Sequence, residues 1–504
     1  MSNAVSNTFS FCFRVLPRCA TFVVIALSVV MLTSCSFRSS HQRFYEDFTE
    51  RLPAPVRIEY PEPEEWELSN GLKVLFVRDD ELPIVSGALF LRGGLFHAPE
   101  GEYRALDAMG EMLRFGGTKK LSAERLDLRL RELAASVSSG YSAEFGQVSF
   151  NSLSVDVHEV FPLFADVLLR PRFDEERLGV LKTQFLESIR RSGDDPNSVA
   201  RITADYLLYK KSPFGSVSES SDVDQLNRLA LLRAHRHYVR PDGAVLAITG
   251  SISREEVERL VNQHLLKWEP RGALLPEPRR DIEKAPAGIY FVEGDYTQAV
   301  IQVVQPGPDR HTRDRYAISL LNGIMGDGLD SRLAKKIRAD LGLAYTVYGV
   351  VSPGYQEGKN TLFIQTKSES AFDALERALA ELQIIQKEPP LVDELEVVQY
   401  AAQSTFVFRF TSPGQVLERM VLLDYFGYPA DYDERYIENI FAVSRQDVSD
   451  VARRWWDLAD FRIVVVASSE AIEEIKRRAS SSPVLSSYIA RDLEFHEIPR
   501  EKPL

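Results

Sequence analysis

Two carboxylates, Asp107 and Glu111, stand four residues apart in the segment LDAMGEMLRFGGT at residues 106–118. On a helix this spacing puts both side chains on one face, one turn apart, where they could offer two oxygen atoms to a hard cation. Two carboxylates are only half of such a site, because the cation needs further carboxylate or carbonyl ligands. The alternative interpretation is that both are solvated or form ion pairs with Arg104 or Arg114.

The histidines are poorly placed for binding zinc. The chain has eight of them, no two stand four residues apart, and residues 98–157 contain none. A helical histidine pair separated by one turn, as in catalytic zinc sites, is therefore absent. His235 and His237 form a close pair, but their place at the end of an expected helix favours a surface or packing role. From the residues alone we predict no bound metal.

Composition limits the class of protein. With 504 residues, of which 44% are hydrophobic and 26% charged, the chain is long enough for two or more domains with full cores. Its net charge of −13 argues against nucleic acid as a partner. We therefore expect a globular protein that acts on something other than DNA or RNA.

Residues 1–35 are typical of a targeting segment. Arg14 and Arg18 precede an apolar run over residues 20–32, and Leu-Thr-Ser-Cys follows at residues 32–35. This pattern resembles a bacterial lipoprotein signal peptide, in which cleavage precedes a cysteine that is then acylated, here Cys35. A plain transmembrane anchor is the alternative, but the run is shorter than the roughly 18–20 residues that a spanning helix needs.

The signal implies a lipid-anchored protein of the bacterial cell envelope. Ser36 after the acylated cysteine is similar to the pattern that sorts lipoproteins to the outer membrane, so we expect the folded part to face the periplasm. Residues 36–63 are polar and contain several prolines, as suits a tether. Cys12 and Cys19 lie in the removed segment, so no internal disulfide is expected in the mature chain.

The first half of the remaining chain alternates between strand and helix patterns. Asn70-Gly71 between alternating apolar residues predicts a hairpin over residues 65–77. Further strands are predicted at residues 84–91, 136–156 and 243–252, and helices at 103–115, from 122, at 160–192 and at 224–238. The pattern indicates an α+β fold with long helices on a mixed or antiparallel sheet.

The second half repeats this order after a proline-containing linker. Strands are predicted at residues 289–304 and 345–364, and helices at 314–324 and 331–338. Residues 237–250 have a counterpart at 454–467, which indicates internal duplication with a period of about 215 residues. We expect a domain at residues 64–268, a linker at 269–288, a second domain at 289–480 and a tail at 481–504. Two such lobes could form a clamshell with a binding surface between them.

Several motifs occur in an order that resembles the pitrilysin/insulinase family, the inverted zincins, over residues 66–475. They are Pro-Arg-Phe at 171–173, Asp-Asp-Pro at 194–196, Pro-Phe-Gly at 213–215, Tyr-x-x-Pro-Asp at 238–242, Ser-Arg-Leu at 331–333 and Arg-x-x-x-Gly-Leu-Ala-Tyr at 338–345. The resemblance is to the short, two-lobe bacterial and processing-peptidase members. It implies two homologous α+β lobes that handle peptides or unfolded proteins.

The family binds zinc through His-x-x-Glu-His on a helix and a distant glutamate, and the motif glutamate is the general base. The matching histidine positions are Asp107 and Glu111, and the base position is Gly110. The remote ligand, 77 residues after the second histidine, is Ser188. All four residues are changed, and loss of a general base alone costs about a hundred- to ten-thousand-fold in rate. The resemblance therefore implies an eroded site, with no cofactor here and zinc only in a partner chain.

In the second lobe, family members use an arginine and a tyrosine seven residues apart to contact the substrate and the oxyanion beside the zinc. The matching residues are Arg338 and Tyr345. Both side chains donate hydrogen bonds and can stabilise charge that develops on a carbonyl oxygen. The alternative interpretation is that Arg338 caps a helix end and Tyr345 packs in the lobe core.

The resemblance leads to one main hypothesis and two alternatives. Some family enzymes divide the work between a zinc-bearing chain and a chain with an eroded motif. We expect a non-catalytic partner of a zinc-bearing relative in envelope peptide processing, or a self-associating chain, that supplies Arg338 and Tyr345. The alternatives are a peptide-binding or scaffold lipoprotein without proteolysis, and a self-sufficient zinc endopeptidase with unusual ligands.

Overall fold

The computed structural model describes residues 62–210, 212–215, 220–272, 275, 282–326, 328–479, 481–485 and 495–497. The predicted signal peptide with Cys35, and the tether up to residue 61, lie outside these residues. In the described ranges no helix combines the length and the apolar character needed to cross a membrane.

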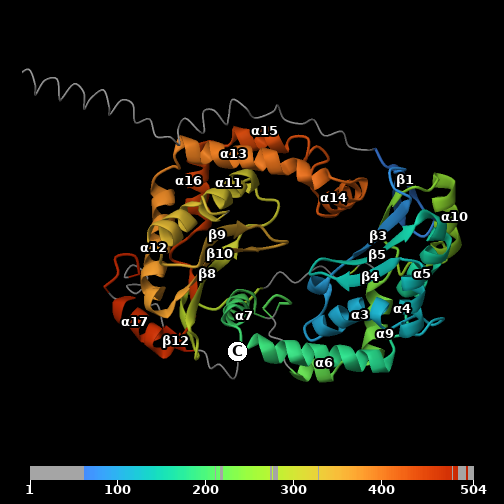
Figure 1. Ribbon diagram of the computed structural model, residues 1–504, viewed down its shortest axis with the longest axis horizontal. Helices are drawn as coiled ribbons and strands as arrows, with labels where there is room; N and C mark the ends of the chain where they lie inside the picture. Colours follow the sequence, from blue (N-terminus) through green and yellow to red (C-terminus); the bar gives the residue numbers. More distant parts are fainter. Residues whose placement is uncertain are drawn as a thin grey trace, which may run out of the picture. The chain divides into compact units, whose positions relative to one another are not determined.

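The first half is a mixed sheet covered by helices (Figure 1). Its strands are β1 (Glu64–Glu67), β2 (Lys73–Arg78), β3 (Ile84–Arg92), β4 (Ser136–Tyr141), β5 (Phe145–Leu153) and β6 (Val245–Gly250). Its helices are α3 (Tyr103–Phe115), α4 (Ala123–Glu132), α5 (Val157–Leu169), α6 (Glu175–Ser192), α7 (Pro196–Tyr209), α8 (Ser220–Asp224), α9 (Arg228–Tyr238) and α10 (Arg254–Leu265). Among the described strands the order is β1-β2-β6-β3-β5-β4, with β2 and β6 parallel and the other pairs antiparallel.

The second half has the same architecture. Its strands are β7 (Gly288–Glu293), β8 (Gln298–Gly307), β9 (Thr346–Ser352), β10 (Gly358–Lys367), β11 (Arg462–Ala467) and β12 (Phe495–Glu497). Its helical elements are α11 (Arg315–Gly326), the π-helix η3 (Ala334–Asp340), α12 (Ala371–Lys387), α13 (Val392–Phe406), the 3-10 helix η5 (Val407–Phe410), α14 (Pro413–Tyr425), α15 (Tyr436–Ala442), α16 (Arg445–Trp455) and α17 (Ser469–Ala479). The described strands are ordered β12-β7-β11-β8-β10-β9, and β7 is parallel to both β11 and β12.

The two sheets share one topology in five of their six described strands, and differ in the outer strand, which is antiparallel in the first sheet (β1) and parallel in the second (β12). A parallel pair, β2/β6 in one sheet and β7/β11 in the other, is followed by three antiparallel strands, and β2 and β7 begin about 215 residues apart. The predicted α+β class and the predicted duplication are confirmed. The residue boundaries given above for the two domains and the linker stay predictions.

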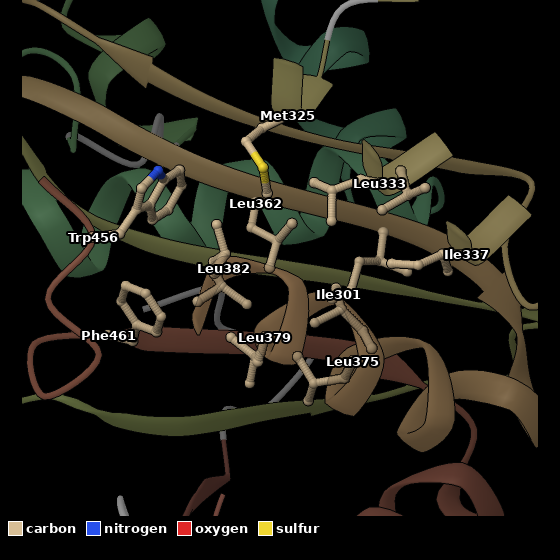
Figure 2. Packing of buried hydrophobic residues seen from close by; sticks show 14 of the residues in the cluster. Ile301, Met325, Leu333, Ile337, Leu362, Leu375, Leu379, Leu382, Trp456 and Phe461 are labelled. Atoms are coloured by element: carbon tan, nitrogen blue, oxygen red, sulfur yellow. The ribbon is translucent and has the colours of Figure 1, made fainter. Parts of the chain in front are cut away.

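Each sheet has its own core on one face. In the second half, Leu362, Leu379 and Met325 pack with Trp456 and Phe461 between the sheet and α12 (Figure 2). A corresponding cluster in the first half joins its sheet to α3, α5 and α9. Successive side chains of a strand point to opposite faces, so the other face of each sheet needs a cover of its own.

Helices from the opposite half provide that cover. Six buried side chains of α7 pack on the second sheet, where Tyr290 and Val292 face them while Ile289 and Phe291 face the core. On the first sheet, Leu417 and Val421 of α14 pack against Leu75, Val77, Phe90 and Ala247. The two halves are therefore joined by buried apolar surface as well as by the chain between them.

Three sequence predictions need correction. Residues 160–192 are not one helix, because Pro171 cannot continue α5 and the side chain of Asp174 accepts hydrogen bonds from the backbone N–H groups that begin α6. Helix 224–238 is interrupted too, since Asn227 caps a new helix, α9. The predicted helix at 331–338 is mainly the π-helix η3, which runs to Asp340. The hairpin at Asn70-Gly71 is confirmed, with Gly71 at φ 86°.

Candidate functional site

Helix α3 holds the two carboxylates of the candidate site. Leu106, Met109 and Leu113 fix the helix in the core, as their helical spacing predicts. The next face of the helix presents Asp107, which is partly buried, and Glu111, which is exposed. The two side chains lie one turn apart on the same face.

Arg104 forms an ion pair with one of the two carboxylates, that of Asp107. Its guanidinium Nη1 donates to Oδ2 of Asp107 at 2.8 Å. Burial raises the pKa of Asp107 above its ordinary value, and the nearby guanidinium opposes the rise. Partial desolvation beside the neighbouring side chains also raises the pKa of Glu111, and repulsion from Asp107 adds to the rise. The Glu111 carboxylate bonds to no residue that the structure describes. The expected pairing with Arg104 is confirmed for Asp107, whereas Arg114 pairs instead with Asp127 at 2.7 Å.

Gly110, at the position of the general base, is pressed against the edge strand β4. A Cβ atom added to it would lie 2.8 Å from the backbone nitrogen of Tyr141 and 3.1 Å from the carbonyl carbon of Gly140. The Ser139 hydroxyl on β4 also bonds to α3: it donates to the Gly110 carbonyl at 2.7 Å and accepts from the backbone N–H of Arg114 at 3.1 Å. The space that a side chain would need at this position is therefore taken by backbone.

Ser188, at the remote ligand position, lies exposed on α6. Helix α6 is a neighbour of α3, because the Arg104 guanidinium carbon lies 4.9 Å from the ring centre of Phe185, three residues before Ser188. The structure thus brings together the two helices, α3 and α6, that carry the zinc-site positions implied by the family resemblance. The cationic group between them is an arginine side chain.

Arg338 and Tyr345 lie on η3 and in the turn before β9. Both side chains are exposed, Tyr345 to 46%, and neither has a hydrogen bond, ion pair or ring contact with a described residue. Gly342, at φ 63°, makes the turn, and the backbone N–H of Tyr345 donates to Gln365 at 2.8 Å. The alternative that Tyr345 packs in the lobe core is wrong, because the side chain is exposed. Arg338 lies in the last turn of η3, as the other alternative expects, and its side chain bonds to no described residue.

The close histidine pair has a packing role. His235 contacts the carbonyl oxygen of Leu168 through Nε2 at 2.8 Å and lies against Phe173, and burial lowers its pKa. His237 packs edge-on against Tyr238. These contacts agree with the packing interpretation given above.

The chain is similar in sequence to known peptidase M16 proteins. The model of the peptidase M16 inactive domain matches residues 225–403. An uncharacterized zinc protease of Streptomyces coelicolor is 24% identical over 352 residues, which cover 68% of this chain and 76% of that protein. The non-peptidase homolog YmxG of Helicobacter pylori is 21% identical over 410 residues, 79% of this chain and 92% of its own length.

A solved structure agrees with these matches. The crystal structure of a peptidase M16 inactive domain from Pseudomonas fluorescens has a TM-score of 0.72 at 23% identity, covering 81% of this chain and 98% of that one. These matches agree with the resemblance to the pitrilysin-like M16 family. The family resemblance and the expected two-sheet fold are thus confirmed.

The residues of this M16 homologue do not fit the zinc ion that the family implies. The four positions supply two carboxylates, a hydroxyl group and a glycine, whereas catalytic zinc sites use three strong nitrogen, sulfur or oxygen ligands. Asp107 is already neutralised by Arg104. Across the described ranges, no three His, Cys, Asp or Glu side chains form a group that could hold a metal ion. These positions therefore offer no route to a zinc-activated water in this chain.

Sequence reasoning missed two features of the M16 site. The first is the close contact of α3 with β4, for which Gly110 facing the small residues Ser139 and Gly140 is the available signal. The second is that β4 lies at the edge of its sheet, with no further strand beside it in the described part of the chain. An unpaired edge next to α3 has free backbone donors and acceptors, which suit an extended peptide.

Proposed function

We propose that this protein is a zinc-less M16 subunit that assists a zinc-bearing relative in hydrolysing peptides. Its contribution would be the two donor side chains, Arg338 and Tyr345, and a surface that holds the substrate. The single observation that carries the proposal is that both donors are exposed and unpartnered among the described residues, while position 110 has no room for a base.

The exposure of the two donors favours action on another molecule. A guanidinium and a phenol that have no partner in their own chain keep their hydrogen-bonding capacity for a substrate or a second chain. Leu329 and Leu341, on either side of η3, are also exposed, which gives the donors an apolar surround. Exposed apolar groups around polar anchors are typical of a protein contact surface.

The closed space at Gly110 argues against hydrolysis by this chain alone. Restoring a glutamate there would require β4 or α3 to move, because two of the three nearest atoms belong to the backbone of β4. The name of one relative, a non-peptidase homolog, is consistent with this loss. We further propose that the protein works in the bacterial envelope, anchored to the outer membrane through Cys35, on the basis of its N-terminal sequence.

Co-expression with a zinc-bearing M16 relative of the same cell tests the proposal. The pair should co-purify and hydrolyse a quenched fluorescent peptide faster than either chain alone. Tyr345→Phe and Arg338→Gln should each lower kcat by about a hundred- to a thousand-fold, as expected for loss of an oxyanion donor, and leave the complex intact. Lys336→Gln, on the same exposed turn of η3, is the matched control and should leave kcat unchanged. Full activity in both donor variants would refute the proposal.

A second candidate function is peptide holding without proteolysis. The unpaired edge of β4 favours it, because strand addition needs only backbone groups and no metal. This candidate predicts peptide binding by the chain alone and no gain of hydrolysis with any M16 relative. An assay of peptide binding in the absence of a partner, followed by the co-expression experiment, distinguishes the two functions.

A further inference from the structure

A cavity of about 410 Å³ lies between η5 and α14, away from α3 and η3. Six of its ten lining residues are aromatic or aliphatic, with Phe426, Tyr428, Tyr432 and Leu423 among them. The four polar ones are Arg409, Gln415, Arg419 and Glu418, and the Glu418 carboxylate accepts a hydrogen bond from Nε2 of Gln147 at 3.5 Å. Cavities of this size and lining are typical of sites for small ligands or for one or two residues of a peptide. Its polar lining decides what kind of ligand it can hold.

Of the two arginines in the lining, one is neutralised and one is not. Arg419 donates through Nε to Oδ2 of Asp433 at 2.5 Å, and its Nη2 donates to the other oxygen of the same carboxylate. Arg409 has no hydrogen bond or ion pair with any described residue. The positive charge of Arg409 is therefore available to a ligand.

Aromatic rings hold the Arg409 guanidinium in place. Its central carbon lies 4.8 Å from the ring centre of Tyr436 and 5.3 Å from that of Phe406. These two rings stack on each other at 4.6 Å with an angle of 6° between their planes, so they form one rigid platform. A guanidinium that rests on a ring face keeps its N–H groups free at the edge, where a carboxylate can accept two parallel hydrogen bonds.

The rest of the cavity offers apolar contact and a further donor. Phe408, beside the arginine, is 68% exposed, which is costly for a large apolar side chain unless a ligand covers it. Burial raises the pKa of Tyr432 to about 12, so its phenol stays neutral. A ligand that matches this lining has one carboxylate next to a large apolar group.

We propose that this cavity binds the free C-terminal carboxylate of a peptide that ends in a bulky apolar residue. The carboxylate would be held by Arg409 and the last side chain by the aromatic walls, and the rest of the peptide would leave through the open mouth. A single unpaired guanidinium fits a monoanion better than a phosphate group, which attracts several cations. This proposal does not rest on the partner role of Arg338 and Tyr345.

Fluorescence anisotropy with the full chain tests it. The probes are fluorescein-labelled Ala-Ala-Phe with a free carboxylate and the same peptide with a C-terminal amide. The acid should bind about ten- to a hundredfold more tightly, and Arg409→Gln should remove that preference. Arg435→Gln, an exposed arginine outside the cavity, is the matched control and should retain it.

Two results would overturn the proposal. They are equal binding of acid and amide, and a preference for the acid that survives Arg409→Gln. If Arg409→Gln does not fold, Leu423→Glu replaces it. This variant adds a second carboxylate to the cavity, besides that of Glu418, and should also abolish the preference for the acid.

Discussion

Gly110→Ala tests whether α3 is pressed onto β4 as tightly as the structure indicates. The added methyl group would lie 2.8 Å from the backbone nitrogen of Tyr141, 3.0 Å from its Cδ2 atom and 3.1 Å from the carbonyl carbon of Gly140. Two of these three atoms are backbone, so they cannot move aside by a change of rotamer. Overpacking of this kind costs about 1–3 kcal/mol. Replacing a glycine inside a helix by alanine stabilises the helix by about 1 kcal/mol. The free energy of unfolding should therefore fall by about 0–2 kcal/mol in total.

Gly179→Ala is the matched control. Gly179 is also a helical glycine, on the exposed side of α6, and an added Cβ atom there would meet nothing within 4 Å. The variant should therefore gain about 0.5–1 kcal/mol. Because the helix propensity term is common to both variants, the difference between them isolates the contact with β4, about 1–3 kcal/mol.

Urea unfolding of both variants, followed by circular dichroism, measures this difference. Gly110→Ala should unfold at a lower urea concentration than the parent protein, and Gly179→Ala at a higher one, with similar m-values. If Gly110→Ala is as stable as Gly179→Ala, the space beside β4 is not closed. The structural argument against a general base at this position would then fail.

Three further predictions follow from individual contacts. Changing all four eroded positions back to the family's zinc ligands and base should not give stoichiometric zinc by elemental analysis, because Gly110 has no room for the glutamate; one equivalent of tightly bound zinc would contradict this. Arg310 and Glu144 form an ion pair between the halves, with side-chain exposures of 11% and 18%. Arg310→Gln and Glu144→Gln should each lower the free energy of unfolding, measured in urea, by about 3 kcal/mol. The double variant should lower it by less than the sum of the two single variants. Glu111→Gln should raise the melting temperature at pH 7, because the raised pKa of Glu111 shows that folding disfavours the charged carboxylate. The gain in melting temperature should vanish as the pH falls below about 4.5, where the carboxyl group is protonated in both the folded and the unfolded state. A gain that persists at pH 4 would refute this prediction.

Much of the fold follows from local sequence signals. Alternating apolar residues around Asn70-Gly71 predict the first hairpin, and the spacing of Leu106, Met109 and Leu113 predicts the buried face of α3. These signals work because strand and helix periods are set by the backbone. The same local signals failed at residues 160–192, where the apolar pattern continues through a break set by Pro171 and the cap at Asp174.

The candidate site was only partly predictable. The family resemblance implies Asp107, Glu111 and Ser188 as the eroded zinc-site positions, and the pairing of Asp107 with Arg104 follows from their distance of three residues along the helix. The contact of Gly110 with β4 depends on how two elements pack, and a sequence records only that the residues are small. The sequence also left undetermined whether Tyr345 is exposed, because an aromatic residue after a glycine turn can be buried or exposed.

The apolar pattern of α7 and α14 explains why the halves of this protein depend on each other. Tyr290 and Val292 alternate with the core residues of β7, so the second sheet has two apolar faces, and its own helices cover one of them. Without α7, a helix of the first half, the other face would be exposed to water, and the first sheet depends on α14 in the same way. The packing between the two halves does not involve the four eroded zinc-site positions, so loss of the residues for zinc chemistry leaves it intact. The survival of the fold around an eroded motif is therefore no evidence for hydrolysis, and the case for a function rests on side chains that folding does not need, such as Arg338, Tyr345 and Arg409.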